Sequence, residues 1–69
     1  MFTIGEFSKL GRISPRMLRY YDAMGLLRPT RIGENGYRYY EAAQLETLAE
    51  IETLKDYGFA LSEIGELLT

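Results

Sequence analysis

The sequence predicts a mainly α domain of four short helices, with a two-stranded hairpin between the second and the third. Three observations indicate this fold class. Two helix start signals stand close together near the N-terminus, an Asn-Gly pair precedes a run of aromatic residues, and leucine and isoleucine recur at helical spacing in the last third. A chain of 69 residues holds one small domain, and we expect its stability to be modest.

The first two helices are predicted to form a helix-turn-helix unit. Thr3 and Glu6 have the spacing of a capping box, and Gly11 ends a first helix of about eight residues. Ser14 is the N-cap of the second helix, which Gly25 ends. The turn between the two helices is short and contains glycine, which is typical of helix-turn-helix units.

The second helix is amphipathic. At about 100° per residue, Leu18 and Tyr21 fall on an apolar face, whereas Arg16, Arg19 and Tyr20 fall on a polar face. A helix fits the major groove of B-DNA, and arginine reaches phosphates and base edges with bidentate geometry. The arginine face therefore indicates a helix that reads double-stranded DNA.

The aromatic run is predicted to form a hairpin, or wing, beside the helices. An Asn-Gly pair suits a type I′ turn, and the proline ahead of the first strand places that strand at an edge. Alternation puts Tyr37 and Tyr39 on one face of the second strand and Arg38 and Tyr40 on the other. We expect Arg38 to reach DNA and Tyr40 to be structural.

The last third of the chain predicts two further helices. Leucine and isoleucine recur in steps of three from Leu45 to Leu54, and Gly58 closes this helix. Ile64, Leu67 and Leu68 belong either to the core or to a contact between two copies of the chain. The expected boundaries are about 3–25 for the helix-turn-helix unit, 28–40 for the wing, and 41–57 and 60–68 for the last two helices.

Charge is divided unevenly along the chain. Residues 1–40 carry seven basic and three acidic side chains, a net charge of +4, whereas residues 41–69 carry one basic and seven acidic side chains, a net charge of −6. This segregation allows a cationic face to meet an anionic partner although the whole chain is acidic.

Several function classes are excluded at this level. The chain has no Cys and no His, which removes thiolate and imidazole chemistry and the ordinary ligands of zinc. We therefore expect neither an enzyme nor a cofactor or metal site. Long apolar runs and a secretory signal pattern are missing, so we expect a cytoplasmic protein without a membrane partner, associated with the nucleoid when it is bound to DNA.

Three stretches carry a resemblance to a known family. They are residues 4–8 (IGEFS), residues 17–22 with 25–29 (MLRYYD and GLLRP), and residues 36–40 (GYRYY). In this order and spacing, over essentially the whole chain, the sequence resembles the N-terminal DNA-binding domain of MerR-family transcriptional regulators. The resemblance implies a winged helix-turn-helix fold.

The resemblance also implies roles for individual side chains. The major groove would receive Arg16 and Arg19, while tyrosine hydroxyls and the wing would contact the DNA backbone. Periodicity puts Tyr21 on the core side, which fits a DNA contact if its ring is buried and its hydroxyl emerges at the DNA surface. The expected DNA-binding residues are Lys9, Arg16, Arg19, Tyr20, Tyr21, Tyr37 and Arg38.

The family also implies partners. A parent protein would bind a promoter as a homodimer, one half-site to each copy, and would act on RNA polymerase indirectly by distorting the DNA. The chain itself would be a monomer or a weak dimer, either an excised domain or a complete small protein. Two alternatives stay open: an excisionase-like architectural DNA-binding protein, and a protein-interaction module that uses the acidic third and fourth helices.

Overall fold

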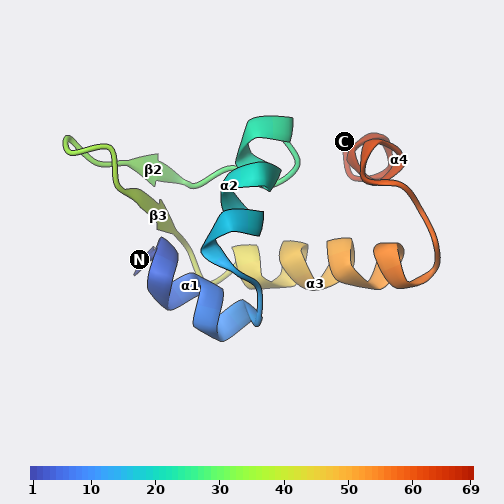
Figure 1. The fold of residues 1–69 in the computed structure, drawn as a ribbon, viewed down its shortest axis with the longest axis horizontal. Helices are drawn as coiled ribbons and strands as arrows, with labels where there is room; N and C mark the ends of the chain where they lie inside the picture. Colours follow the sequence, from blue (N-terminus) through green and yellow to red (C-terminus); the bar gives the residue numbers. More distant parts are fainter.

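The computed structural model describes residues 1–69 as four helices and one small antiparallel sheet, which confirms the predicted fold class (Figure 1). Helix α3 runs along one side of the molecule, α1 and α2 pack near its first half, and α4 lies at its far end. The hairpin projects from the opposite end to α4. The elements are β1 (Phe2–Thr3), α1 (Ile4–Gly11), α2 (Pro15–Met24), β2 (Arg31–Ile32), β3 (Arg38–Tyr40), α3 (Gln44–Asp56) and α4 (Leu61–Leu67).

Both helices of the helix-turn-helix unit begin where the sequence predicts. The Thr3 N–H donates to Glu6 Oε1 over 2.8 Å and the Glu6 N–H donates to Thr3 Oγ1 over 3.2 Å, so the capping box is complete. The Ser14 hydroxyl accepts from the Met17 N–H at 3.1 Å and caps α2, and Gly25, with a φ of 73°, is the left-handed C-cap that follows Met24.

Gly11 has a different role from the one predicted. It is the last residue of α1, and the left-handed position after the helix is taken by Arg12, with a φ of 54°. A Cβ on Gly11 would collide with the Leu48 side chain of α3. The glycine therefore makes room for the Leu48 side chain where α1 approaches α3, and it does not form a left-handed turn.

The wing is part of a three-stranded sheet. As predicted, β2 and β3 pair antiparallel, with Arg31 opposite Tyr39, and β2 is an edge strand. Strand β1 pairs with the other side of β3, with Phe2 opposite Tyr40, and the sequence analysis missed this strand. The additional pairing ties the wing to the start of α1.

The predicted type I′ turn is wrong. Gly36 has a φ of 81°, but Asn35 is not in the left-handed region. The Gly33 N–H donates to the Tyr37 carbonyl and the Gly36 N–H to the Gly33 carbonyl, which makes a three-residue loop with a left-handed glycine at its end. The Asn35 side chain accepts from the Tyr37 N–H at 3.2 Å, and this local hydrogen bond stabilises the three-residue loop.

Helices α3 and α4 are each shorter than predicted. Helix α3 begins at Gln44, because residues 41–43 form a turn that has no side-chain cap. The Gln44 side chain supports this turn: its oxygen accepts from the Glu41 N–H at 2.8 Å, and its amide nitrogen donates to the Arg28 carbonyl over 2.6 Å. At α4 the Glu63 carboxylate accepts from the Ala60 N–H at 2.8 Å, which supplies one bond of a capping box.

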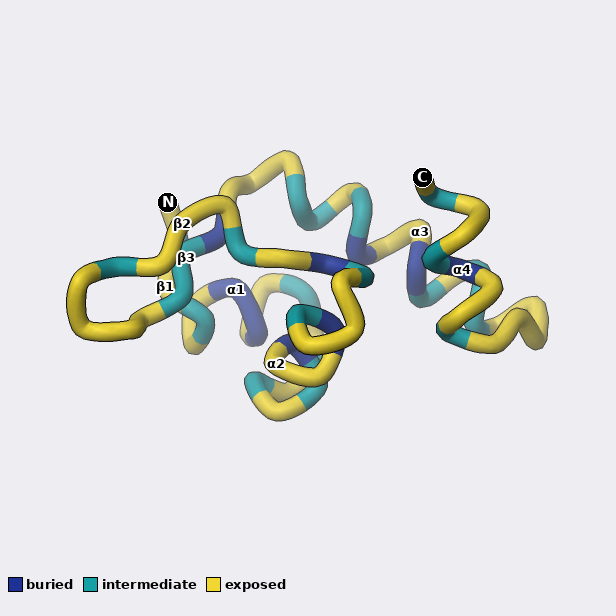
Figure 2. The backbone as a smooth tube through the Cα atoms, turned by 90° about the horizontal axis from the view of Figure 1, so that it is seen from above, coloured by how far each residue is buried: buried dark blue, intermediate teal, exposed yellow.

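The core lies where α1, α2, α3 and the sheet meet, and α4 covers its far end (Figure 2). The Phe7 and Tyr40 rings stack at its centre, with centroids 4.5 Å apart and an interplanar angle of 13°. Ile64 is fully buried and Leu67 is 56% exposed, so Ile64 belongs to the core of this chain. The eight buried apolar residues are Phe7, Leu18, Tyr21, Leu27, Tyr40, Leu48, Ile51 and Ile64.

The capping box predicts an acid-sensitive first helix. The Thr3 backbone and side chain lower the pKa of Glu6 from its ordinary value of 4.5. A carboxyl whose pKa is lower in the folded state stabilises the fold above its unfolded pKa, and this stabilisation is lost as the pH falls through the lowered value. We expect the unfolding free energy to decline less on acidification in Glu6→Gln than in the parent chain, measured by urea unfolding at neutral and acidic pH. Identical declines would contradict the assignment.

Candidate nucleic-acid interface

Helix α2 presents the polar face that its sequence predicts. Arg16, Arg19 and Tyr20 are exposed, whereas Leu18 and Tyr21 are fully buried. The exposed side chains begin in the first turn of the helix, directly after the Ser14 cap. The helix therefore offers a solvated cationic face over a fixed apolar base.

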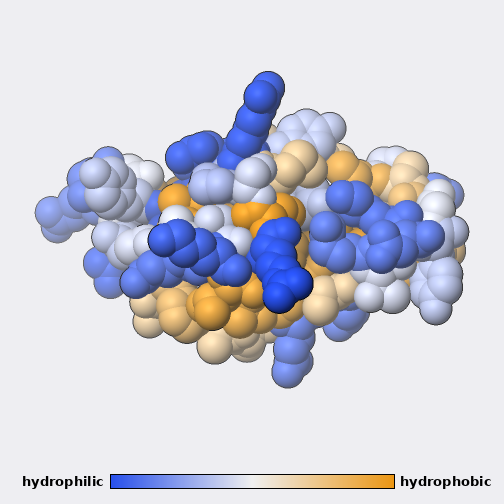
Figure 3. All heavy atoms as spheres, turned by 60° about the horizontal axis from the view of Figure 1, so that its bottom comes forward, coloured by the Kyte–Doolittle hydropathy of each residue, from blue (hydrophilic) through white to orange (hydrophobic).

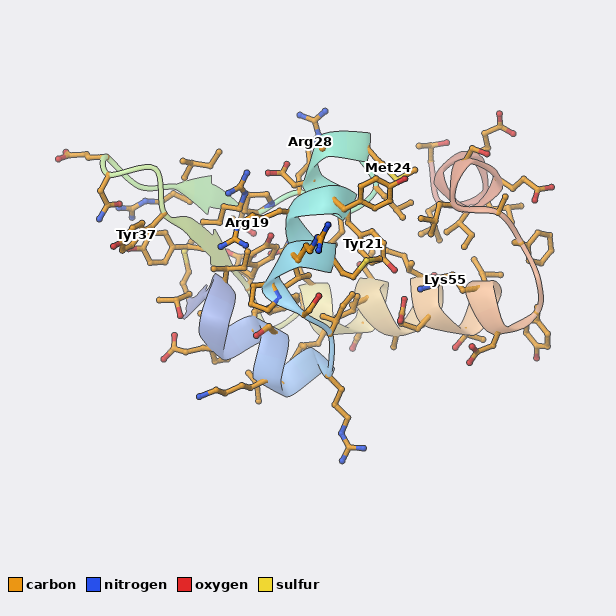
Figure 4. All side chains as sticks on the ribbon, in the orientation of Figure 1. Arg19, Tyr21, Met24, Arg28, Tyr37 and Lys55 are labelled. Carbon is orange, nitrogen blue, oxygen red and sulfur yellow. The ribbon has the colours of Figure 1, made fainter.

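The wing and α2 together form a concave site. A groove of about 360 Å³ joins the N-terminus of α1, the middle of α2 and the wing. Arg19 lies on the side of α2 that faces the wing, and Tyr37 lies on the wing (Figure 4). Tyr37 is 62% exposed, so its ring is available to a partner. The residues that line the groove are Thr3, Ile4, Arg19, Gly36, Tyr37 and Arg38.

An ion pair ties the wing to α2. Arg38 Nε donates to Asp22 Oδ2 over 2.8 Å, and the two side chains are 30% and 17% exposed. Arg38 also lines the groove beside Arg19. Arg38 is therefore a groove-lining residue whose guanidinium is anchored through Nε.

Tyr40 lies under this ion pair as a structural residue, as the sequence predicts. Its side chain is fully buried against Phe7, and its hydroxyl has no hydrogen-bond partner. Burial raises the pKa of Tyr40, and the nearby Asp22 carboxylate raises it further. The phenol is therefore neutral at ordinary pH and supports the wing through packing.

The predicted position of the Tyr21 hydroxyl is wrong. The ring is buried, as periodicity indicates, but the hydroxyl points toward α3 and not to the surface that holds Arg19 (Figure 4). It donates to Glu52 Oε2 over 2.9 Å and accepts from Lys55 Nζ at 3.2 Å. Burial raises the pKa of Tyr21, and the hydrogen bond to Tyr21 raises the pKa of Lys55. Tyr21 therefore holds the back of α2 against α3.

The geometry predicts separate effects of Tyr21→Phe on stability and on DNA binding. Loss of the hydroxyl removes two hydrogen bonds to charged groups, and we expect the unfolding free energy to fall by about 1–2 kcal/mol in urea titrations. Because the hydroxyl points away from Arg19 and Tyr37, the affinity of the folded variant for duplex DNA should stay unchanged. A selective loss of DNA affinity at full stability would show that the hydroxyl contacts DNA.

The other predicted residues lie outside the groove. Lys9 is exposed in the last turn of α1, and Arg16 is exposed in the first turn of α2. Sequence reasoning left out three exposed arginines, Arg12, Arg28 and Arg31, the last of which lies 5.8 Å above the Tyr39 ring. Their positive charge was the one feature of the sequence that could have identified them as candidates for DNA contact.

A second groove differs in character. It lies between α1 and α3, and Figure 3 shows apolar side chains gathered on the face that these helices form. No basic side chain lines it, so it offers nothing to an anionic ligand. Its lining residues are Leu10, Gly11, Leu45, Leu48, Ala49 and Glu52.

The structure contains neither a cluster of metal ligands nor a helix suited to cross a membrane. No group of three or more carboxylate, thiol or imidazole side chains is arranged to hold a metal ion. None of the helices combines the length and the apolarity that crossing a bilayer requires.

The fold and the groove define a winged helix-turn-helix domain. The chain belongs to the MerR HTH family of regulatory proteins, whose family model matches residues 2–69. This confirms the resemblance carried by the three sequence stretches.

Similar proteins cover nearly all of the chain. An uncharacterised HTH-type transcriptional regulator of Pseudomonas aeruginosa is 47% identical over 66 residues, which are 96% of this chain and 50% of that protein. The multidrug-efflux transporter 2 regulator of Bacillus subtilis is 49% identical over 67 residues, 97% of this chain and 24% of that protein. The chain thus spans half or less of the length of these relatives.

A solved structure agrees closely with the fold. The cryo-EM structure of the EcmrR–DNA complex in EcmrR-RPo matches with a TM-score of 0.96 and 40% identity, over 99% of this chain and 26% of that chain. That protein is bound to DNA in its structure.

Proposed function

We propose that this chain binds double-stranded DNA in a sequence-specific manner and serves a transcriptional regulator as its reader of one promoter half-site. The observation that carries the proposal is the groove in which Arg19 of α2 meets Tyr37 and Arg38 of the wing. Two elements distant in sequence thus present cationic and aromatic side chains on one face, the arrangement that phosphate and groove contacts need. Family membership supports the same function.

The proposal divides the work among the side chains. Arg16 and Arg19 enter the major groove from α2, since the exposed face of a recognition helix begins with its first turn. Tyr20 contacts the backbone beside them through its hydroxyl. Arg38 and Tyr37 contact phosphate and sugar from the wing, which fixes the orientation of α2 on the duplex.

Lys9 is proposed to add a peripheral phosphate contact. It is exposed on α1, outside the groove, so its contribution should be electrostatic and independent of base sequence. Tyr21 is not part of the proposed interface, because its hydroxyl is bonded to α3.

For the regulator as a whole we propose a homodimer on a two-fold promoter site. Each copy of this domain reads one half-site, and distortion of the DNA between the half-sites allows RNA polymerase to engage. The relatives, which are named as regulators, support the regulatory part of this proposal. DNA-bound proteins of this kind work in the cytoplasm, at the nucleoid.

The proposed function predicts salt-sensitive DNA binding. If about four phosphates are neutralised by the cationic face, the logarithm of the association constant should fall with the logarithm of salt concentration at a slope of about −3.6. Fluorescence anisotropy of a labelled pool of random duplex DNA, titrated with the chain across a salt series, measures this slope. Affinity that does not change between low and moderate salt would contradict the electrostatic interface.

If no binding is seen at low salt, a second experiment separates a domain that binds only as a dimer from a domain that does not bind DNA. If the single chain does not bind, appending a dimeric coiled coil tests whether two linked copies bind a duplex. Binding by the linked dimer would support a half-site reader that needs its partner. No binding by either form would contradict the function.

A further inference from the structure

Asp22 is an acidic residue on the element that is proposed to meet DNA. It belongs to α2, three residues after Arg19, and its side chain is only 17% exposed. An acid at this position repels phosphate, so its presence calls for a function that outweighs the repulsion.

The carboxylate of Asp22 holds the wing. Its bond to Arg38 Nε is the only hydrogen bond between α2 and the hairpin strands. The hairpin is also attached through β1, through the stacking of Tyr40 on Phe7, and at its base through the Gln44 side chain of α3, which bonds the Thr30 hydroxyl and the Arg28 carbonyl. The spacing between recognition helix and wing is therefore set, on the α2 side, by one charge-assisted contact.

The contact also orients Arg38. A guanidinium has five N–H donors in a rigid planar fork, so fixing Nε fixes the direction of the terminal amino groups. Arg38 lines the groove together with Arg19 and Tyr37. An arginine held in this way loses less side-chain freedom when it binds a phosphate than one that is free in solvent.

We propose that Asp22 is a positioning residue for DNA binding, which holds Arg38 and the wing at a fixed distance from α2. The inference rests on the proposed function. It predicts an effect whose sign is opposite to simple electrostatics: removing this negative charge weakens the binding of a negatively charged ligand. A residue that merely neutralised Arg38 would act in the reverse direction, since its loss would free a cation for phosphate.

The test compares Asp22→Asn with Glu34→Gln in the anisotropy assay. Glu34 is an exposed acid in the wing loop that forms no ion pair, so its replacement reports the effect of charge alone. We expect Asp22→Asn to lower the DNA affinity by at least about threefold and to reduce the salt slope by about 0.9, the value for one phosphate contact. Glu34→Gln should leave the affinity unchanged or raise it.

A double-mutant cycle tests whether Asp22 acts through Arg38. In an Arg38→Ala background the carboxylate has no guanidinium to hold, so Asp22→Asn should cause no further loss and should raise the affinity by removing an unpaired acid. Asp22→Glu, which keeps the carboxylate, should restore part of the affinity that Asp22→Asn loses. Circular dichroism and urea unfolding confirm that each variant is folded at the assay temperature.

The outcomes are distinguishable. If the parent chain binds and Asp22→Asn binds equally well or more tightly, the inference is overturned and the proposed function stands. An equal loss from Asp22→Asn with and without Arg38 also overturns it. If neither the parent chain nor its linked dimer binds DNA, the proposed function fails and the inference fails with it.

Discussion

Replacing Arg16 and Arg19 together by alanine should lower the affinity for duplex DNA by at least about thirtyfold. An arginine that reads a base edge contributes about 1–3 kcal/mol, and two such residues on one helix face act on the same duplex. Both side chains are exposed on α2, so their removal leaves the core intact. Fluorescence anisotropy at low salt, on a duplex selected from a random pool by the parent chain, measures the loss.

A matched double variant on the acidic helix provides the control. Glu46→Gln with Glu50→Gln also changes two exposed charges on one helix, but on α3, away from the groove. We expect a mild effect on DNA affinity, toward tighter binding. If the α2 variant kept its affinity for DNA while the α3 variant lost the biological function of the protein, the protein-interaction alternative would replace DNA binding.

Phe7→Ala should leave the chain largely unfolded at room temperature. Phe7 is fully buried and stacks on Tyr40, so truncation removes both its transfer free energy and the ring contact and opens a cavity. Such changes cost about 3–5 kcal/mol, which is comparable with the whole stability of a domain of this size. Circular dichroism and thermal unfolding detect the loss of the cooperative transition.

Leu67→Ala is the comparison for Phe7→Ala. Leu67 is 56% exposed in α4 and lies outside the buried core, so its truncation should change the unfolding midpoint little. A Phe7→Ala variant with the midpoint of the parent chain would contradict the placement of the core at the contact between α1 and the sheet.

Local signals were the part of the fold that the sequence could predict. Thr3 with Glu6 and Ser14 with Met17 make bonds within four residues, so their spacing alone defines both helix starts. The exposed face of α2 could be predicted from helical periodicity, and the burial of Leu18 on the opposite face agrees with it.

Tertiary contacts were the part that it could not predict. Strand β1 has two residues, too few to show alternation, and it forms only because β3 arrives from more than thirty residues away. The role of Gly11 is visible only once Leu48 is seen against it. The contact between Asp22 and Arg38 could not be predicted either, because it joins α2 to β3 and no local sequence pattern indicates that these two elements lie close together.

The candidate site shows the same division. Arg19, Tyr37 and Arg38 were selected from local patterns, and their meeting in one groove follows from the sheet and from α2. Periodicity was right about the Tyr21 ring, whereas the expectation for its hydroxyl was wrong. A buried phenol bonds to whichever polar group the next helix supplies, and here α3 supplies Glu52 and Lys55.

The most direct test of the DNA interface is an amide NMR titration of the chain with a short duplex at low salt. We expect shift changes in the first half of α2, at Arg16, Arg19 and Tyr20, and in the wing at Gly36 and Tyr37, with little change along α3. Changes confined to α3 and α4, with α2 and the wing unaffected, would contradict the claim that the helix-turn-helix and wing face binds DNA.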